Sequence, residues 1–163
     1  MTQRTRTHAW ADPVELAAAA VSRPGLEFMQ AMHRGDLPMP PISSLIGMEG
    51  VSAEEGEVVF SCTPAEWMYN PIGSVHGGIA LTLLDSAMGC AVHTTCEAGT
   101  GYTSLEVKLN FVRGISVQTG LLHATGTVVH RGRRVATAEG RLTEAAGGRL
   151  LAHASSTCLI VAP

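Results

Sequence analysis

One acidic side chain interrupts a long apolar stretch of the sequence. Residues 76–95 consist largely of Ala, Leu, Ile, Val, Met and Gly, and Asp85 lies near their middle. Its neighbours three and four positions away carry no charge, so no intrahelical salt bridge is available. An unpaired carboxylate in apolar surroundings is costly, and enzymes use desolvated carboxylates for acid–base and nucleophilic chemistry. Asp85 is therefore the first candidate for catalysis. The alternative is that it accepts backbone or Ser86 hydrogen bonds, or points into solvent.

The residues just before this stretch suit the binding of a polarised oxygen atom. Ser74 is the expected N-cap of a helix whose first turn is His76-Gly77-Gly78. The first N–H groups of a helix lack intrahelical acceptors and carry partial positive charge, and glycine allows close approach to the backbone. Such a helix start can form an oxyanion hole for a carbonyl. The alternative is that Gly77 and Gly78 only permit tight packing of helix on sheet.

His76 and Asp85 cannot face the same reacting atom from one helix. They are nine residues apart, which is roughly 13 Å along a helix axis and roughly 180° around it. If both act in one reaction, they must come from two different chains. The spacing therefore predicts a homodimer with two composite sites. The low content of charged residues, 15%, also favours an oligomer that covers part of its surface.

A basic turn offers a third candidate site. It consists of Arg131-Gly132-Arg133-Arg134. Arginine side chains match phosphate oxygens in geometry and charge, so this turn is a candidate clamp for a phosphorylated ligand. The alternative is an ordinary solvated hairpin turn.

Other chemistries find little support. The sequence contains no G-x-S-x-G, G-x-G-x-x-G, P-loop or H-E-x-x-H motif. The remaining histidines, His93 among them, show no metal-ligand spacing and are expected at the surface or hydrogen-bonded in the core. No metal and no cofactor are expected. The four cysteines form no C-x-x-C pair, which indicates free thiols in a cytoplasmic protein. A net charge of −3, with no membrane-length apolar run and no signal peptide, argues against nucleic-acid and membrane partners.

The surrounding elements predict an α+β fold. Asp12 is an expected N-cap, followed by Pro13 and Glu15 in a first helical turn, and Gly35 is expected to end a second helix. We therefore divide the chain into a flexible tail, 1–11, a helical extension, 12–36, and one domain, 37–163. A stiff extended connector is expected at the prolines between 38 and 41.

Strand patterns fill the rest of the domain. Strands are predicted at 45–51, 57–63, 104–111, 120–130, 134–144 and 149–160. In 104–111, alternation predicts that Leu105, Val107, Leu109 and Phe111 face the helix and that Ser104 faces away. A curved antiparallel sheet wrapped around one long buried helix accommodates these elements.

One combination of residues resembles a known family. Asn70-Pro71, Gly73, His76-Gly77-Gly78 and Asp85 together resemble the PaaI-like branch of the hotdog-fold acyl-CoA thioesterases, and the resemblance extends over about residues 26–160. It implies metal-independent hydrolysis of an acyl-CoA thioester, in which coenzyme A is part of the substrate. It also implies a homodimer that joins the sheets of two chains, and we expect such dimers to assemble into a tetramer.

The resemblance also implies roles for individual residues. The Gly77 N–H would polarise the thioester carbonyl, and Asp85 of the other chain would act as general base or nucleophile. The other implied site residues would position substrate or water, supply a hydroxyl, or contact coenzyme A: Asn70, His76, Gly78, Ser104, Arg131, Gly132, Arg133 and Arg134.

Two other functions fit the same fold. A hotdog enoyl-CoA hydratase would need a histidine a few residues after the helix Asp, and here His93 lies eight residues on. A non-catalytic acyl-CoA-binding protein would not need the unpaired carboxylate of Asp85.

Overall fold

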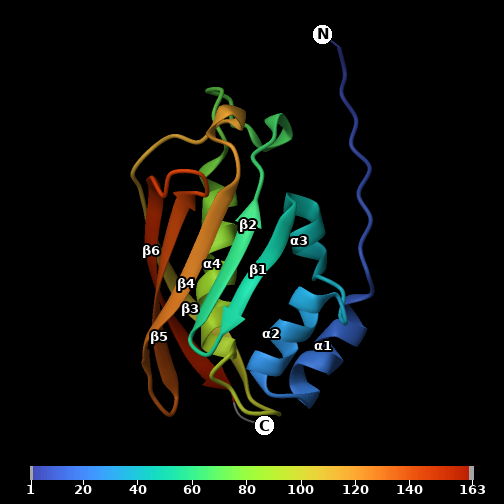
Figure 1. Cartoon of the computed structure of the whole chain (residues 1–163), viewed down its shortest axis with the longest axis vertical. Helices are drawn as coiled ribbons and strands as arrows, with labels where there is room; N and C mark the ends of the chain where they lie inside the picture. Colours follow the sequence, from blue (N-terminus) through green and yellow to red (C-terminus); the bar gives the residue numbers. More distant parts are fainter. Residues whose placement is uncertain (1, 162–163) are drawn as a thin grey trace.

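A single antiparallel sheet wraps around one long helix. The computed structural model describes residues 2–161. Six strands lie in the order β1-β2-β4-β5-β6-β3, and α4 lies against one face of the sheet (Figure 1). The strands are β1 (Met48–Glu54), β2 (Glu57–Cys62), β3 (Gly101–Phe111), β4 (Leu122–Arg131), β5 (Val135–Glu144) and β6 (Leu150–Val161). The predicted α+β hotdog fold is confirmed.

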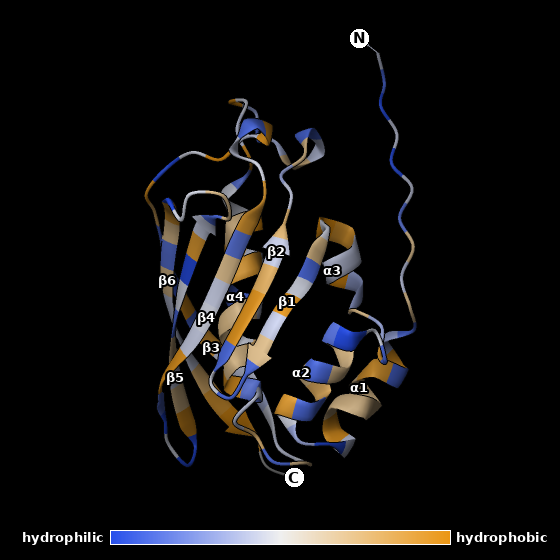
Figure 2. Ribbon diagram, viewed as in Figure 1, coloured by the Kyte–Doolittle hydropathy of each residue, from blue (hydrophilic) through white to orange (hydrophobic). Residues whose placement is uncertain are grey.

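Helix α4 (Gly77–His93) forms the centre of the core. Leu83, Leu84 and Met88 are fully buried beneath the sheet, as the apolar sequence predicts. The helix comes very close to the strands at Gly126 of β4, where a Cβ atom would lie 2.3 Å from the Ala87 carbonyl carbon. This close approach explains why a glycine stands in the middle of that strand. Figure 2 shows the apolar residues of α4 and of the strands that cover it.

Two helices precede the sheet at the predicted places. In α1 (Pro13–Ser22), the Asp12 side chain caps the helix by accepting the Val14 N–H at 2.8 Å. Helix α2 (Gly25–Arg34) ends at Gly35, whose φ of 78° is the left-handed conformation typical of a glycine C-cap. Both helices lie beyond the β1 edge of the sheet, and α2 contacts β1 and α4 (Figure 1).

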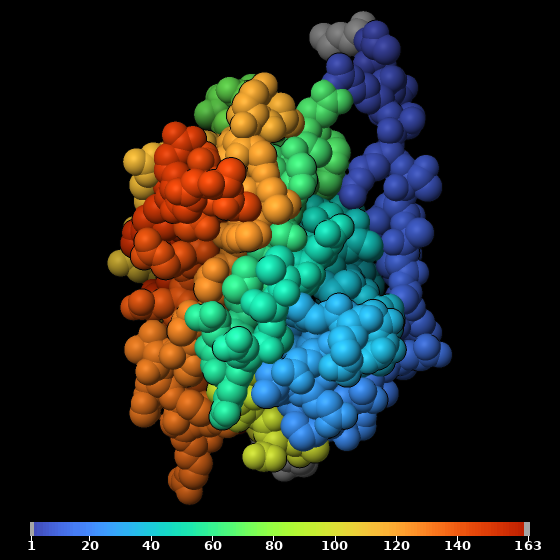
Figure 3. Space-filling model, in the orientation of Figure 1, coloured from blue at the N-terminus to red at the C-terminus, as the bar shows by residue number. Residues whose placement is uncertain are grey.

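The prediction of an extended connector at the prolines between 38 and 41 is wrong at Pro41, where a helix begins. Residues Pro41–Ile46 form the short helix α3, which takes the place of the expected start of the first strand at 45. Proline suits the first position of a helix because its missing N–H would have no acceptor there. Gly47, with φ of 67°, ends the helix and turns the chain into β1. Residues 2–12 have no helix or strand and run along the outside of this region (Figure 3).

The alternation predicted for β3 is broken by a β-bulge. Ser104 pairs with Cys158 and Glu106 pairs with Thr157, so Leu105 is an extra residue without a partner position on β6. The bulge shifts the alternation by one residue, so Ser104 before it and Val107 and Leu109 after it all face the helix. Leu105 is therefore 58% exposed, contrary to the prediction. Phe111 is 62% exposed, but its ring lies over the start of α4 at Gly77. Val107 and Leu109 are partly buried against the core, as predicted.

The two edges of the sheet are formed by β3 and β1. β3 lies at the sheet edge beside β6, and residues 112–121 carry the chain back to β4, which pairs with β2 and β5. The other edge is β1. No helix within residues 2–161 is long and apolar enough to span a membrane.

Candidate active site

The loop that leads into α4 is folded around the side chain of Asn70. Its Oδ1 accepts hydrogen bonds from the N–H groups of Ile72 and Ser74, both at 3.1 Å. Its Nδ2 donates to the Ser74 hydroxyl at 3.0 Å. Gly73 completes the loop with φ of 84°. Both ends of the Asn70 amide are thus engaged in shaping the backbone directly before the helix.

His76 is the N-cap of α4, and the prediction that Ser74 has this role is wrong. The His76 Nδ1 accepts the Gly78 N–H at 2.9 Å, whereas the Ser74 hydroxyl accepts the Asn70 amide. An Nδ1 atom that accepts a hydrogen bond is unprotonated, so the neutral ring carries its proton on Nε2. The ring is exposed, and its Nε2–H can donate to a ligand.

The backbone N–H of Gly77 is unpaired at the start of the helix. No acceptor within residues 2–161 binds it. Gly77 lines a cavity of about 370 Å³ together with Asn70, His76 and Phe111. An unpaired N–H at a helix start, where the dipole is positive, is what an oxyanion hole requires.

Close packing also requires a glycine at position 77. A Cβ atom there would lie 2.5 Å from Cζ of Phe111, which reaches over the helix start from the end of β3. At Gly78, a Cβ atom would lie 3.0 Å from the His76 ring. The packing explanation of the two glycines and the oxyanion explanation are therefore compatible.

Asp85 lies in the middle of α4 and receives a hydrogen bond from β3. The Ser104 hydroxyl donates to Asp85 Oδ1 at 2.8 Å. The prediction that Ser104 faces away from the helix is wrong, because the bulge at Leu105 turns Ser104 inward. Asp85 and Ser104 line a second cavity of about 220 Å³, whose other walls are mostly apolar. The carboxylate is half-buried, and its Oδ2 has no hydrogen-bond partner within the described residues.

A single chain keeps these two groups apart, as the helical spacing predicts. The cavity at the helix start and the cavity beside Asp85 have no lining residue in common. His76, Gly77 and Asn70 thus share one cavity, while Asp85 and Ser104 share another. No group of three or more His, Cys, Asp or Glu side chains within residues 2–161 has the geometry of a metal site.

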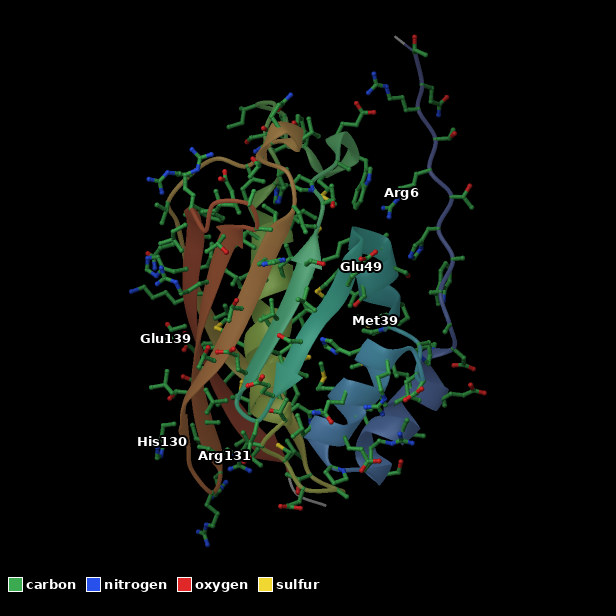
Figure 4. The ribbon with its side chains drawn as sticks, in the orientation of Figure 1. Arg6, Met39, Glu49, His130, Arg131 and Glu139 are labelled. Atoms are coloured by element: carbon green, nitrogen blue, oxygen red, sulfur yellow. The ribbon has the colours of Figure 1, made fainter. Side chains whose placement is uncertain are left out.

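The arginine turn lies at the opposite end of α4 from the His76 loop. Figure 4 shows Arg131 beside the β4–β5 hairpin, and its Nε donates to the Thr95 hydroxyl at 3.2 Å just beyond the end of the helix. Arg131 also bonds to the Gly132 carbonyl oxygen. Arg133 and Arg134 are exposed. Of the three arginines, these two are the ones whose guanidinium groups are open to a ligand.

Sequence reasoning missed two residues that line the helix beyond Asp85. Tyr102 lines the Asp85 cavity and packs on Gly89, and His93 is 6% exposed. Neither ring nitrogen of His93 has a hydrogen-bond partner, so the expectation of a surface or hydrogen-bonded core histidine is wrong. The spacing of Asp85, Gly89 and His93, four residues each, was the available signal.

Cysteine chemistry is disfavoured beside Asp85. Burial raises the pKa of the Cys90 thiol to about 12, and the Asp85 carboxylate adds to this shift. The thiol therefore stays protonated at neutral pH and is a poor nucleophile. Cys90 is therefore not a candidate nucleophile in this cavity.

Comparison with known proteins identifies related sequences. The profile described as the thioesterase superfamily matches residues 72–151. A 1,4-dihydroxy-2-naphthoyl-CoA hydrolase of Listeria monocytogenes is 29% identical over 103 residues, which are 63% of this chain and 82% of that protein. Human acyl-coenzyme A thioesterase 13 is 29% identical over 107 residues, which are 66% of this chain and 75% of that protein.

Solved structures show the same architecture. A phenylacetic acid degradation-related protein of Ralstonia eutropha is 28% identical with a TM-score of 0.72, covering 80% of this chain and 98% of that one. The PaaI protein of Escherichia coli has the same fold, with a TM-score of 0.72 at 22% identity, covering 86% of this chain and 96% of that one.

Proposed function

Because this chain belongs to the thioesterase superfamily and is a thioester hydrolase, we propose that it hydrolyses an acyl-CoA thioester to free acid and coenzyme A. The observation that carries the assignment of the site is the hydrogen bond from Ser104 to Asp85, at 2.8 Å, inside a mostly apolar cavity. An enzyme of this class needs a group that attacks the carbonyl or activates water, and a group that stabilises the resulting oxyanion.

The Gly77 N–H is the proposed oxyanion donor. It is unpaired within the described chain, it lies at the positive end of α4, and it lines a cavity of about 370 Å³. The exposed His76 Nε2–H is a second donor at the same cavity, for the substrate or for the attacking water. Asn70 acts indirectly, since its hydrogen bonds hold the loop that precedes His76. Asn70 is thus a positioning residue.

Asp85 is the proposed general base, or the nucleophile that forms a mixed anhydride. The Ser104 hydroxyl donates to one carboxylate oxygen and thereby orients the group. The other oxygen remains available to accept a proton from water or to attack the carbonyl carbon. In both routes water ends in the acid product, and the coenzyme A thiol leaves with a proton.

The complete site is proposed to form between two chains. Asp85 and Gly77 line separate cavities in one chain, so a second chain must supply the other half of each active site. β3 is a long edge strand, and exposed Leu105 and Phe111 lie on it. Such edges invite pairing with another strand. We propose a homodimer that joins the two sheets at β3, with assembly of dimers into a tetramer as a further step.

Coenzyme A itself supplies the remaining contacts in this proposal. Its phosphates would meet Arg133 and Arg134, while Arg131 holds the turn by its bonds to Thr95 and Gly132. Gly78 would contact the substrate at the helix start. The reaction is proposed to need no metal or cofactor. The four cysteines are free thiols, which supports a cytoplasmic location.

A thiol-release assay over a panel of acyl-CoA thioesters tests this function. Wild type should release coenzyme A, and Asp85→Asn should lose about 10²- to 10⁴-fold in kcat, the range for general acid–base catalysis. Asp85→Asn keeps the size of the side chain and the Ser104 contact, so loss of folding should not account for the result. A chelator should leave the wild-type rate unchanged. Undiminished release by Asp85→Asn would exclude the role assigned to Asp85.

A further inference from the structure

Three residues of α4 form a continuous row beyond the proposed reacting centre. Asp85, Gly89 and His93 are four residues apart, so their positions follow one another on the same side of the helix. The middle of the row is covered by Tyr102 of β3. A Cβ atom at Gly89 would lie 2.6 Å from Tyr102 Cε2 and 2.7 Å from its Oη. The glycine thus lets the tyrosine ring rest directly on the helix backbone.

Two cavities lie along this row, one on each side of Tyr102. The first, of about 220 Å³, is the one lined by Asp85 and Ser104. The second, of about 270 Å³, is lined by His93. Cys90 and Tyr102 line both cavities. The side chain of Tyr102 therefore separates a cavity next to the proposed reacting centre from a second one farther along the helix.

The N-terminal segment of the chain builds the opposite walls of both cavities. Met32 and Met39 line the cavity beside Asp85, and Figure 4 shows Met39 in the segment between α2 and α3. Ala20 and Phe28 line the second cavity. All four residues precede the part of the chain that matches the thioesterase superfamily, which begins at residue 72. The walls opposite α4 thus come from a part of the chain that lies outside the matched residues 72–151.

His93 gives the second cavity a polar group without a partner. The side chain is buried at 6% exposure, and neither ring nitrogen has a hydrogen bond. Its ring packs against the rings of Phe28 and Tyr102, each with centroids 5.6 Å apart. Burial lowers the pKa of His93, so the ring is neutral at pH 7, with one N–H donor and one acceptor nitrogen. Buried polar groups of this kind normally have a partner.

We propose that the two cavities are successive parts of one acyl-binding channel, in which Tyr102 sets the length of the acyl group and His93 can bind a polar atom at the far end. This inference rests on the proposed thioesterase function and specifies its substrate. A cavity of about 150 Å³ can hold a benzene ring, so the 220 Å³ next to Asp85 accommodates an acyl group of about ring size. Longer acyl groups meet the Tyr102 ring.

Variants at Tyr102 test the division of the channel. Straight-chain acyl-CoA thioesters of increasing length are assayed for hydrolysis, and their non-hydrolysable thioether analogues are titrated by calorimetry. For wild type and the matched control Tyr102→Phe, kcat/KM and affinity should stop rising at the same chain length. Tyr102→Ala should move this limit to longer chains and raise kcat/KM for them by roughly tenfold or more, since each methylene in an apolar pocket contributes a factor of that order.

Two further variants separate a channel from a merely loosened core. In the Tyr102→Ala background, an analogue that is long enough to pass Gly89 and ends in a hydroxyl should bind more tightly than its alkyl counterpart. His93→Leu should remove that difference. Ala20→Phe, which fills the second cavity, should return the limit to the wild-type length. If Tyr102→Ala does not fold, Tyr102→Leu serves the same test with a smaller shift.

The outcomes distinguish this inference from the proposed function. If wild type hydrolyses the thioesters but the folded Tyr102 variant has the same chain-length limit, the channel is overturned. The thioesterase function then remains intact. If wild type hydrolyses none of the thioesters, the proposed function is overturned. If the longest thioether analogue that binds well is still longer for Tyr102→Ala than for wild type, the channel remains as a binding site.

Discussion

At the start of α4 the functional groups are positioned by neighbours in the sequence, whereas along its middle they are positioned by distant elements. Asn70 bonds to residues two and four positions away, and His76 bonds to Gly78. By contrast, Asp85 is held by Ser104, which lies 19 residues on, and the walls around it come from α2, α3 and β3. A local motif can therefore form one half of the site, but the other half requires the whole fold.

The difference has a consequence for how the two halves can vary. Short loops closed by their own hydrogen bonds tolerate few substitutions, because each polar atom already has its partner. Apolar walls tolerate exchanges that keep their volume. We therefore expect the helix start to serve the reaction step common to thioesterases, and the middle of α4 to set the choice of acyl group.

The largest effect is expected when the two halves are separated onto different chains. Homodimers of Asp85→Asn and homodimers of Gly77→Pro should both be nearly inactive, the latter through loss of the N–H, since one oxyanion donor is worth about 10²- to 10³-fold in kcat. After unfolding and refolding together, mixed dimers should recover roughly one working site each. Coenzyme A release measures the recovery.

A matched control isolates the N–H from the steric effect of the substitution. Gly77→Ala introduces the same collision with Phe111 as Gly77→Pro but keeps the N–H. Gly77→Ala should therefore retain substantially more activity than Gly77→Pro. Equal losses in the two variants would mean that position 77 acts by packing alone. No recovery in the mixed dimers would contradict a site shared between chains.

A smaller effect is expected from the hydrogen bond that links β3 to the helix. Ser104→Ala removes a bond to a charged group, worth about 1.5–3 kcal/mol, so kcat should fall roughly tenfold to a hundredfold. Ser104→Thr keeps the hydroxyl and should restore most of the rate. The KM for a short acyl-CoA should change little, because Ser104 is proposed to orient Asp85. A pure rise in KM with unchanged kcat would instead assign Ser104 to substrate binding.

The smallest effect concerns stability and depends on pH. Burial lowers the pKa of His93 below its ordinary value of 6.5. The unfolded chain therefore takes up a proton near pH 6.5, whereas the folded chain takes it up only at lower pH. By linkage, the free energy of unfolding should fall as pH drops below about 6.5. Urea unfolding between pH 5 and 8 measures this slope.

The matched variants are His93→Leu and His130→Leu. His93→Leu should lessen the loss of stability on acidification, whereas replacement of the exposed His130 should leave it nearly unchanged. The same slope in both variants would show that other groups dominate the acid response. That result would weaken the description of His93 as a buried ring without partners.

Much of the molecule follows from local patterns in the sequence. The Asp12 cap, the Gly35 helix end, the buried helix around Leu84 and the strands that follow it all stand close to their predicted places. Each depends on the chemistry of adjacent residues or on a simple hydrophobic period. The separation of His76 from Asp85 was also predictable, because it depends only on the geometry of one helix.

Tertiary structure decided what local patterns could not. One extra residue at Leu105 places Ser104 on the same face of β3 as Val107 and Leu109 and so brings it to Asp85. A bulge leaves no mark on the hydrophobic period until two strands are aligned. Likewise, Tyr102 meets Gly89 and His93 loses its polar partners only because α2 and β3 pack around the same helix. The sequence by itself thus determined the fold and the candidate carboxylate, while long-range packing determined which side chains surround it.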